Sequence, residues 1–166
     1  MRSAYEGYLW KVHNHVLLDG SDQGRKVYSK KLGNLVERYN LNKKIKFVPH
    51  CKEMPIAYSL SDVVVSASIE PEAFGRISVE AQSMGKPIIA SNIGGSKETI
   101  INKKTGLLYK YDDPRELAKN LNTVIQLSPD ELKSMGNEGR KNITKKFDVE
   151  TMCQSNLKEY KRLIKN

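Results

Sequence analysis

The chain contains few cysteines. Only Cys51 and Cys153 occur in 166 residues, and they stand far apart. A small disulfide-stabilised domain needs several cysteines, and a zinc site needs Cys or His residues in close pairs, so the sequence excludes both classes. We expect the two thiols to be reduced and to serve as small core side chains.

Long hydrophobic runs are missing as well. No apolar stretch approaches the roughly 18 residues that a membrane-spanning helix needs. The N-terminal residues "MRSAYEGYLWK" lack the apolar centre of a signal peptide. We therefore expect a cytoplasmic protein. Its length falls within the range of about 100–200 residues that is typical of one domain.

Aromatic residues make up only 7 % of the chain, and basic residues do not gather in one arm. The sequence has no RNP-like aromatic motif and no zinc-finger spacing, so we expect no nucleic-acid partner. The net charge is nevertheless +9, from 28 basic and 19 acidic residues spread along the chain. Such a charge suits a phosphate-bearing ligand, or weak attraction to an anionic membrane surface such as the inner face of the cell membrane.

The sequence alternates strand-like and helix-like segments. Residues 62–68, "DVVVSAS", form a continuous apolar run, which is typical of a strand buried on both faces of a parallel sheet. Alternation with short connections predicts an α/β domain with a Rossmann-like, doubly wound parallel sheet. We expect the other strands at 16–20, 44–50, 86–91 and 105–110, and helices at 25–39, 56–61, 76–84, from 96, and at 114–127, 129–147 and 150–165. The C-terminus is thus expected to be helical.

Two of these strands should deliver loops to one edge of the sheet. Strand 62–68 leads into residues 69–75, and strand 86–91 leads into residues 92–95. In doubly wound sheets, ligands bind beyond the carboxyl ends of the strands. Gly75 stands where the first loop becomes a helix, a position from which backbone N–H groups can hold phosphate oxygens. By default, the second loop is a plain glycine turn with Ser96 capping the next helix.

Glu72 and Glu80 lie on either side of this helix start. Glu80 falls close to the buried stripe that Ile77, Ala81 and Met84 form at helical spacing. A carboxylate in that position needs a polar partner. It could accept hydrogen bonds from the vicinal hydroxyls of a sugar, or it could be a boundary glutamate paired with a nearby lysine. Glu72 alone would be read as an exposed loop carboxylate.

The stretch from residue 66 to residue 100, "SASIEPEAFGRISVEAQSMGKPIIASNIGGSKETI", resembles a known family. It is similar to the nucleotide-sugar-binding, C-terminal half of retaining glycosyltransferases of the GT-B fold, the family-4 group. The family's hallmark is a glutamate, seven residues and a second glutamate, then Gly-x-Pro and Gly-Gly-x-x-Glu. Here these are Glu72 and Glu80, then Gly85-Lys86-Pro87, and Gly94-Gly95 with Glu98. The similarity extends from about residue 16 to the C-terminus.

This resemblance implies a role for each matching residue. Glu72 would contact the donor sugar as the catalytic residue, and Glu80 would accept hydrogen bonds from the ribose. Backbone N–H groups around Phe74, Gly75 and Arg76, with Ile77 beside them, would bind the diphosphate and the sugar. The loop 50–54, from His50, would border the nucleobase. No cofactor or metal is expected, because helix N-termini and basic side chains stabilise the leaving diphosphate instead. The ligand would be a nucleotide-diphosphate sugar that donates a hexose, in the setting of cell-envelope saccharides such as lipopolysaccharide.

The sequence departs from the family pattern at its start. Residues 1–15 do not supply the strand, phosphate-clamping basic pair and helix with which the family's C-terminal half opens, so we expect an atypical start followed by the donor-binding domain at 16–166. A missing first strand would leave a sheet edge uncovered. The family's acceptor domain has no counterpart either, and a separate chain could carry it.

Three other functions stay open at this stage. The chain could be a non-catalytic donor-binding module or a remnant without transfer activity. It could be a basic nucleic-acid-binding domain, or part of a sugar-nucleotide epimerase of the same fold.

Overall fold

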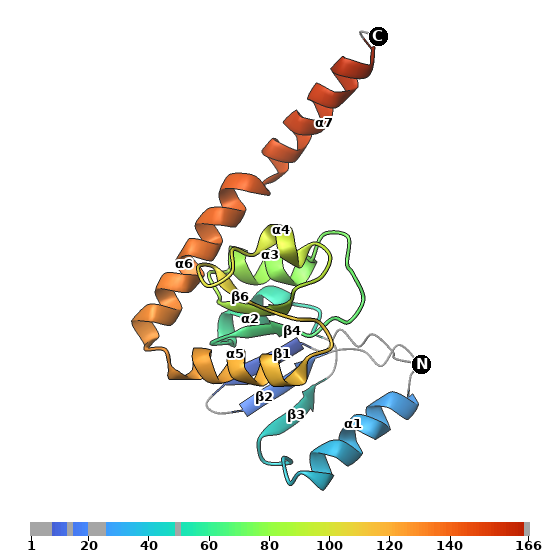
Figure 1. Cartoon of the computed structure of the whole chain (residues 1–166), viewed down its shortest axis with the longest axis vertical. Helices are drawn as coiled ribbons and strands as arrows, with labels where there is room; N and C mark the ends of the chain where they lie inside the picture. Colours follow the sequence, from blue (N-terminus) through green and yellow to red (C-terminus); the bar gives the residue numbers. More distant parts are fainter. Residues whose placement is uncertain (1–7, 13–14, 20–25, 49–50, 165–166) are drawn as a thin grey trace.

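The centre of the molecule is a single sheet. The computed structural model describes residues 8–12, 15–19, 26–48 and 51–164. The strands are β1 (Tyr8–Val12), β2 (His15–Asp19), β3 (Ile45–Val48), β4 (Val64–Ser66), β5 (Ile88–Ser91) and β6 (Gly106–Tyr109). Their order across the six-stranded sheet is β3-β2-β1-β4-β5-β6 (Figure 1). The five strands expected from the sequence are all present, and β1 is an addition to them.

The helices occur where the sequence predicts them, with ends that differ by a few residues. They are α1 (Lys26–Arg38), α2 (Met54–Leu60), α3 (Arg76–Ser83), α4 (Ser96–Thr99), α5 (Pro114–Gln126), α6 (Pro129–Lys146) and α7 (Val149–Ile164). The α/β class and the helical C-terminus are therefore confirmed.

Strand β1 is antiparallel to both of its neighbours. The pairs β2–β3, β4–β5 and β5–β6 are parallel, as predicted, whereas β1 is antiparallel to both β2 and β4. Only two residues separate Val12 from His15. So short a connection can make a hairpin but not the crossover of a dozen or more residues that a parallel pair needs. Since β1 fills the place between β2 and β4, the expectation of an uncovered sheet edge at this point is wrong.

Hydrophobic clusters cover both faces of the sheet. On one face, Tyr58 of α2 and Ile77 and Ala81 of α3 pack with Val64 of β4. On the other face, Val124 of α5 packs with the alternate residues of β4, β5 and β6 (Figure 1). Successive strand residues point to opposite faces, so a strand between two helical layers is apolar throughout. The doubly wound arrangement around β4, β5 and β6 is thereby confirmed.

Tyr109 closes the second cluster at the carboxyl end of β6. It is 4 % exposed. Burial raises the pKa of its phenol to about 12, because a phenolate would lose its hydration there. Tyr109 therefore stays protonated across the neutral pH range.

Helix α6 packs against α3, and α7 projects beyond the sheet toward the C-terminus (Figure 1). No residue of α7 is buried. Its exposed apolar side chains are Val149, Met152, Leu157, Tyr160, Leu163 and Ile164. Cys153, on the same helix, is exposed, and Cys51 is half-buried. The expectation that both cysteines are core residues is wrong, because Cys153 lies on a helix with no buried residue and Cys51 is only half-buried.

Within the part of the chain that the structure describes, no helix combines the length and the apolar character needed to cross a membrane. This agrees with the lack of long apolar runs in the sequence.

Helix α6 begins with a capping box. The Ser128 hydroxyl accepts a hydrogen bond from the Glu131 N–H, and the Glu131 carboxylate accepts one from the Ser128 N–H at 2.7 Å. Pro129 occupies the first turn, where a missing N–H has no effect on the helix. The sequence "SPDE" predicts this start.

Replacing Ser128 by alanine should lower the free energy of unfolding by about 1 kcal/mol, because an N–H at the helix start loses its acceptor. Denaturant unfolding followed by circular dichroism measures the change. The control is Ser134→Ala, the same chemical change at an exposed position inside α6, which should be neutral or slightly stabilising. Equal effects of the two substitutions would contradict a role for the cap.

Candidate functional site

Two loops meet at the carboxyl edge of the sheet. β4 runs into residues 67–75, which lead to α3, and β5 runs into residues 92–95, which lead to α4. Because β4 and β5 are neighbouring parallel strands, both loops leave the sheet at the same edge. The predicted shared rim is confirmed.

The two loops touch through their backbones. The Gly95 N–H donates a hydrogen bond to the carbonyl oxygen of Glu72 at 2.8 Å. A Cβ atom at Gly94 would overlap that same oxygen, and one at Gly95 would overlap the carbonyl group of Phe74. The glycines are thus required for close approach, which is more than a plain turn demands. Gly95 is the N-cap of α4 and Ser96 its first residue, so the expectation that Ser96 caps this helix is wrong.

Helix α3 begins at this contact. Its N-cap, Gly75, has a φ of 71°, a left-handed conformation that glycine adopts without a steric penalty. The first N–H groups of an α-helix have no acceptor within the helix, and the helix dipole places partial positive charge there. The start of α3 is therefore suited to binding an anion such as a phosphate group.

The predicted donor-binding residues around the start of α3 differ in how far their side chains are exposed. Phe74 is 45 % exposed, and its ring packs edge-on against Phe147 at the end of α6, with 5.9 Å between ring centroids. Ile77 is buried in the core cluster under α3, so only its backbone can face a ligand. Glu72 is half-buried on the loop.

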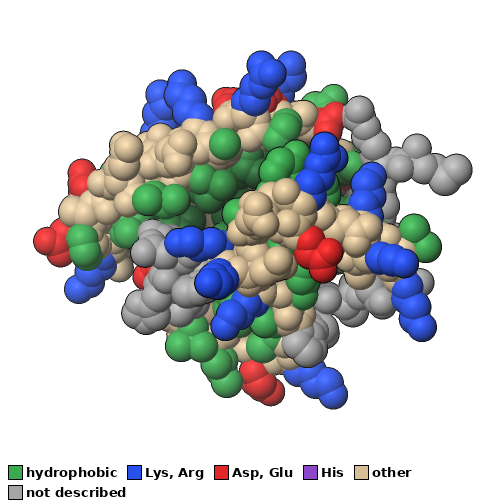
Figure 2. Space-filling model, turned by 90° about the horizontal axis from the view of Figure 1, so that it is seen from below, with side chains coloured by type: hydrophobic (Ala, Val, Ile, Leu, Met, Phe, Trp, Pro, Cys, Tyr) green, Lys and Arg blue, Asp and Glu red, His purple; other side chains and the backbone are tan. Residues whose placement is uncertain are grey.

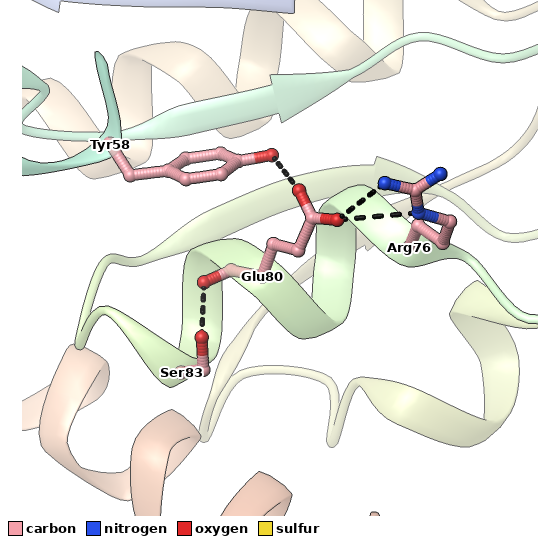
Figure 3. A network of polar contacts seen from close by, with 4 residues as sticks. All are labelled: Tyr58, Arg76, Glu80 and Ser83. Carbon is pink, nitrogen blue, oxygen red and sulfur yellow. Dashed lines mark hydrogen bonds and ion pairs between the residues drawn. The ribbon is translucent and has the colours of Figure 1, made fainter. Parts of the chain in front are cut away.

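Glu80 has two side-chain partners on its carboxylate (Figure 3). One oxygen, Oε2, accepts a hydrogen bond from the Tyr58 hydroxyl at 2.9 Å. The other, Oε1, pairs with the Arg76 guanidinium, at 3.1 Å from Nη2 and 3.3 Å from Nε. The Arg76 side chain is 82 % exposed and that of Glu80 35 %. Glu80 thus has the polar partners that its position beside the buried stripe requires, and its cationic partner is an arginine of its own helix.

Sequence reasoning did not single out Tyr58. It is 2 % exposed and lies 22 positions before Glu80, on another helix. A buried tyrosine normally finds a hydrogen-bond partner for its hydroxyl, and that was the available signal. The identity of the partner depends on how α2 and α3 pack, which a single sequence does not specify.

Two other predicted features are placed only in part. His50 lies outside the described residues. The rest of its loop, 51–53, leads directly into α2, the helix that carries Tyr58.

On the face shown in Figure 2, lysine and arginine side chains are scattered among hydrophobic and acidic ones. Across the described ranges, no group of three or more His, Cys, Asp or Glu residues is arranged to hold a metal ion.

The fold and the two loops at its carboxyl edge define a class of domain, the Rossmann-like C-terminal half of a GT-B enzyme. Residues 19–142 match the family model "Glycosyl transferases group 1". This match spans most of the chain, and the protein therefore belongs to the group 1 glycosyltransferase family.

Solved structures and curated relatives agree with this assignment. A glycosyltransferase from Rickettsia africae ESF-5 superposes with a TM-score of 0.84 at 33 % identity, over 92 % of this chain and 40 % of its own. Anabaena Alr3699/HepE, solved in complex with UDP and glucose, gives a TM-score of 0.77 at 29 % identity, over 84 % of this chain and 38 % of its own. The capsular polysaccharide biosynthesis glycosyltransferase CapM of Staphylococcus aureus is 28 % identical over 126 residues, which are 71 % of this chain and 32 % of CapM. The chain covers only part of the length of the curated relatives it matches, from 32 % of CapM to 19 % of an α-1,3/1,6-mannosyltransferase of Neurospora crassa.

Proposed function

We propose that this chain is the donor-binding domain of a glycosyltransferase that transfers a hexose from a nucleotide-diphosphate sugar. Within that proposal, it is a member of the family-4 group, and transfer proceeds with retention of the anomeric configuration. The observation that carries the proposal is the shared rim, where the start of α3 and the Glu80 carboxylate stand one helical turn apart. The similarity to a structure solved with UDP and glucose supports it.

The start of α3 is the proposed diphosphate site. Backbone N–H groups at Gly75, Arg76 and Ile77, with that of Phe74 before them, would donate to the phosphate oxygens. Charge accumulates on the diphosphate as the sugar leaves, and fixed donors stabilise that charge without reorganising. The buried side chain of Ile77 anchors this backbone in the core, so the donors are held rigidly.

The two glutamates are the proposed contacts to the hydroxyl-bearing parts of the donor. An ionised carboxylate only accepts hydrogen bonds, and its two oxygens can take two neighbouring hydroxyls. Glu80 would bind the ribose, and Glu72, on the loop before the helix, would contact the transferred sugar as the catalytic residue. No cofactor enters this scheme, since the nucleotide sugar is a substrate.

Transfer also needs an acceptor held against the donor, because orientation of the two reactants supplies much of the rate enhancement. We propose that an acceptor domain, on a separate chain or on a longer form of this one, faces the rim. The exposed apolar side chains of α7 support the proposal that another domain packs against this one. The name of CapM supports a setting in cell-envelope saccharide synthesis, in the cytoplasm and at the inner face of the membrane, where the basic surface would meet anionic lipid.

Calorimetric titration of the chain with UDP, GDP, ADP and their sugar conjugates tests donor binding. The expected result is saturable binding at one site with preference for one nucleotide. A response to none of them would contradict the proposed function. Steeply salt-dependent binding to DNA or RNA in its place would favour a nucleic-acid-binding role.

A further inference from the structure

The carboxylate of Glu80, which is predicted to bind the ribose, accepts one hydrogen bond from a residue on another helix. The Tyr58 hydroxyl, at the end of a ring packed in the core cluster with Ile77 and Ala81, donates to Glu80 Oε2 at 2.9 Å. Figure 3 shows the phenol reaching from α2 across to the carboxylate on α3. We propose that Tyr58 is a positioning residue that presets the Glu80 carboxylate for the ribose hydroxyls of the donor. This inference rests on the proposed function.

The two partners of the carboxylate differ in how firmly they are held. The Tyr58 ring is 2 % exposed, so core packing fixes its torsions. The Arg76 side chain is 82 % exposed, and an exposed ion pair within one helix contributes little because water and salt screen it. A ligand can therefore displace Arg76 from Oε1 far more easily than it can displace Tyr58 from Oε2.

This difference assigns separate roles to the two carboxylate oxygens. Oε2 stays with Tyr58 and fixes the plane of the carboxylate, and Oε1 is the oxygen that a ribose hydroxyl takes over from Arg76. The released guanidinium belongs to Arg76, the first residue of α3, where its charge attracts the diphosphate. A carboxylate held in advance loses less side-chain freedom when the ligand binds.

The test must separate positioning of Glu80 from a second role, in which Tyr58 only stabilises the packing of α2 on α3. Tyr58→Phe keeps the ring in the core and removes only the hydroxyl. For the nucleoside diphosphate that the chain binds, UDP being the first probe, the dissociation constant should rise about five- to ten-fold, because the Glu80 carboxylate is then ordered only when the ligand binds. The 2′,3′-dideoxy form of the same nucleotide should bind Tyr58→Phe and the unaltered chain equally, because it has no ribose hydroxyls to place.

Two further variants complete the experiment. Tyr58→Phe in a Glu80→Ala background should have no additional effect on affinity, since no acceptor for the Tyr58 hydroxyl is then left at position 80. Tyr160→Phe, at an exposed position on α7, is the control for hydroxyl removal and should bind as the unaltered chain does. Thermal unfolding of each variant shows whether the fold is retained.

The outcomes distinguish this inference from the proposed function. If the nucleotide binds and Glu80→Ala weakens its binding while Tyr58→Phe does not, the positioning role is overturned and the donor site stands. Equal losses of affinity for the ribo- and dideoxynucleotides in Tyr58→Phe would likewise overturn it, because the hydroxyl would then act through general packing. If no nucleotide binds the unaltered chain, the proposed function and this inference fall together.

Discussion

Replacing Gly95 by alanine is expected to abolish nucleotide binding and to lower the free energy of unfolding by about 3 kcal/mol. The added methyl group would overlap the carbonyl group of Phe74 and lie 2.7 Å from its Cα atom. These are backbone atoms, so they cannot rotate away as the end of a long side chain would. The loops must separate, and the hydrogen bond from Gly95 to Glu72 is lost with their contact. Denaturant unfolding and calorimetric titration measure the two effects.

The control for this substitution is another glycine of the same chain. Gly33 lies inside α1, and a Cβ there meets no atom within 4 Å. Gly33→Ala should therefore stabilise the protein by about 0.5–1 kcal/mol through helix propensity and leave nucleotide binding unchanged. Normal binding by Gly95→Ala would show that the contact between the loops does not shape the site.

Glu80→Ala is expected to weaken binding of a nucleoside diphosphate about 100-fold while the fold stays intact. A hydrogen bond to a charged group contributes about 1.5–3 kcal/mol, and the carboxylate would accept from the ribose in the bound complex. A loss of about 2.7 kcal/mol corresponds to two factors of ten in the dissociation constant. Titration calorimetry of the variant checks the magnitude.

Glu138→Ala provides a matched comparison. The Glu138 side chain is 33 % exposed, close to the 35 % of Glu80, and it also forms an ion pair within its own helix, with Lys141. It also pairs with Lys104, which precedes β6 and so lies at the amino edge of the sheet, opposite the rim, and its removal should not change nucleotide affinity. Similar losses in the two variants would mean that general charge, and not the placement of Glu80, attracts the ligand.

The strands and helices could be predicted because local signals are strong in this chain. The apolar run of β4 occurs only where a strand is covered on both faces, and the "SPDE" start of α6 satisfies its own backbone groups. The meeting of the two loops at one rim followed from topology, because parallel neighbouring strands end at the same edge. None of these inferences needed long-range contacts.

The direction of β1 and the partner of Glu80 were not predicted. β1 pairs with β2 next to it in sequence and with β4, which is remote in sequence, and the pairing with β4 places β1 inside the sheet. Tyr58 and Glu80 meet because α2 and α3 pack on the same face of the sheet, an arrangement set by the whole core. The need for Gly94 and Gly95 likewise arises from the approach of another loop. In each case, the missing information was tertiary contact.

The position of a bound nucleotide tests the central claim most directly. A crystal structure of the chain with the nucleoside diphosphate that titration selects is expected to show the phosphates at the start of α3 and the ribose hydroxyls within hydrogen-bond distance of the Glu80 carboxylate. A nucleotide bound elsewhere on the surface, with Glu80 and the residues from Phe74 to Ile77 making no contact to it, would contradict the account.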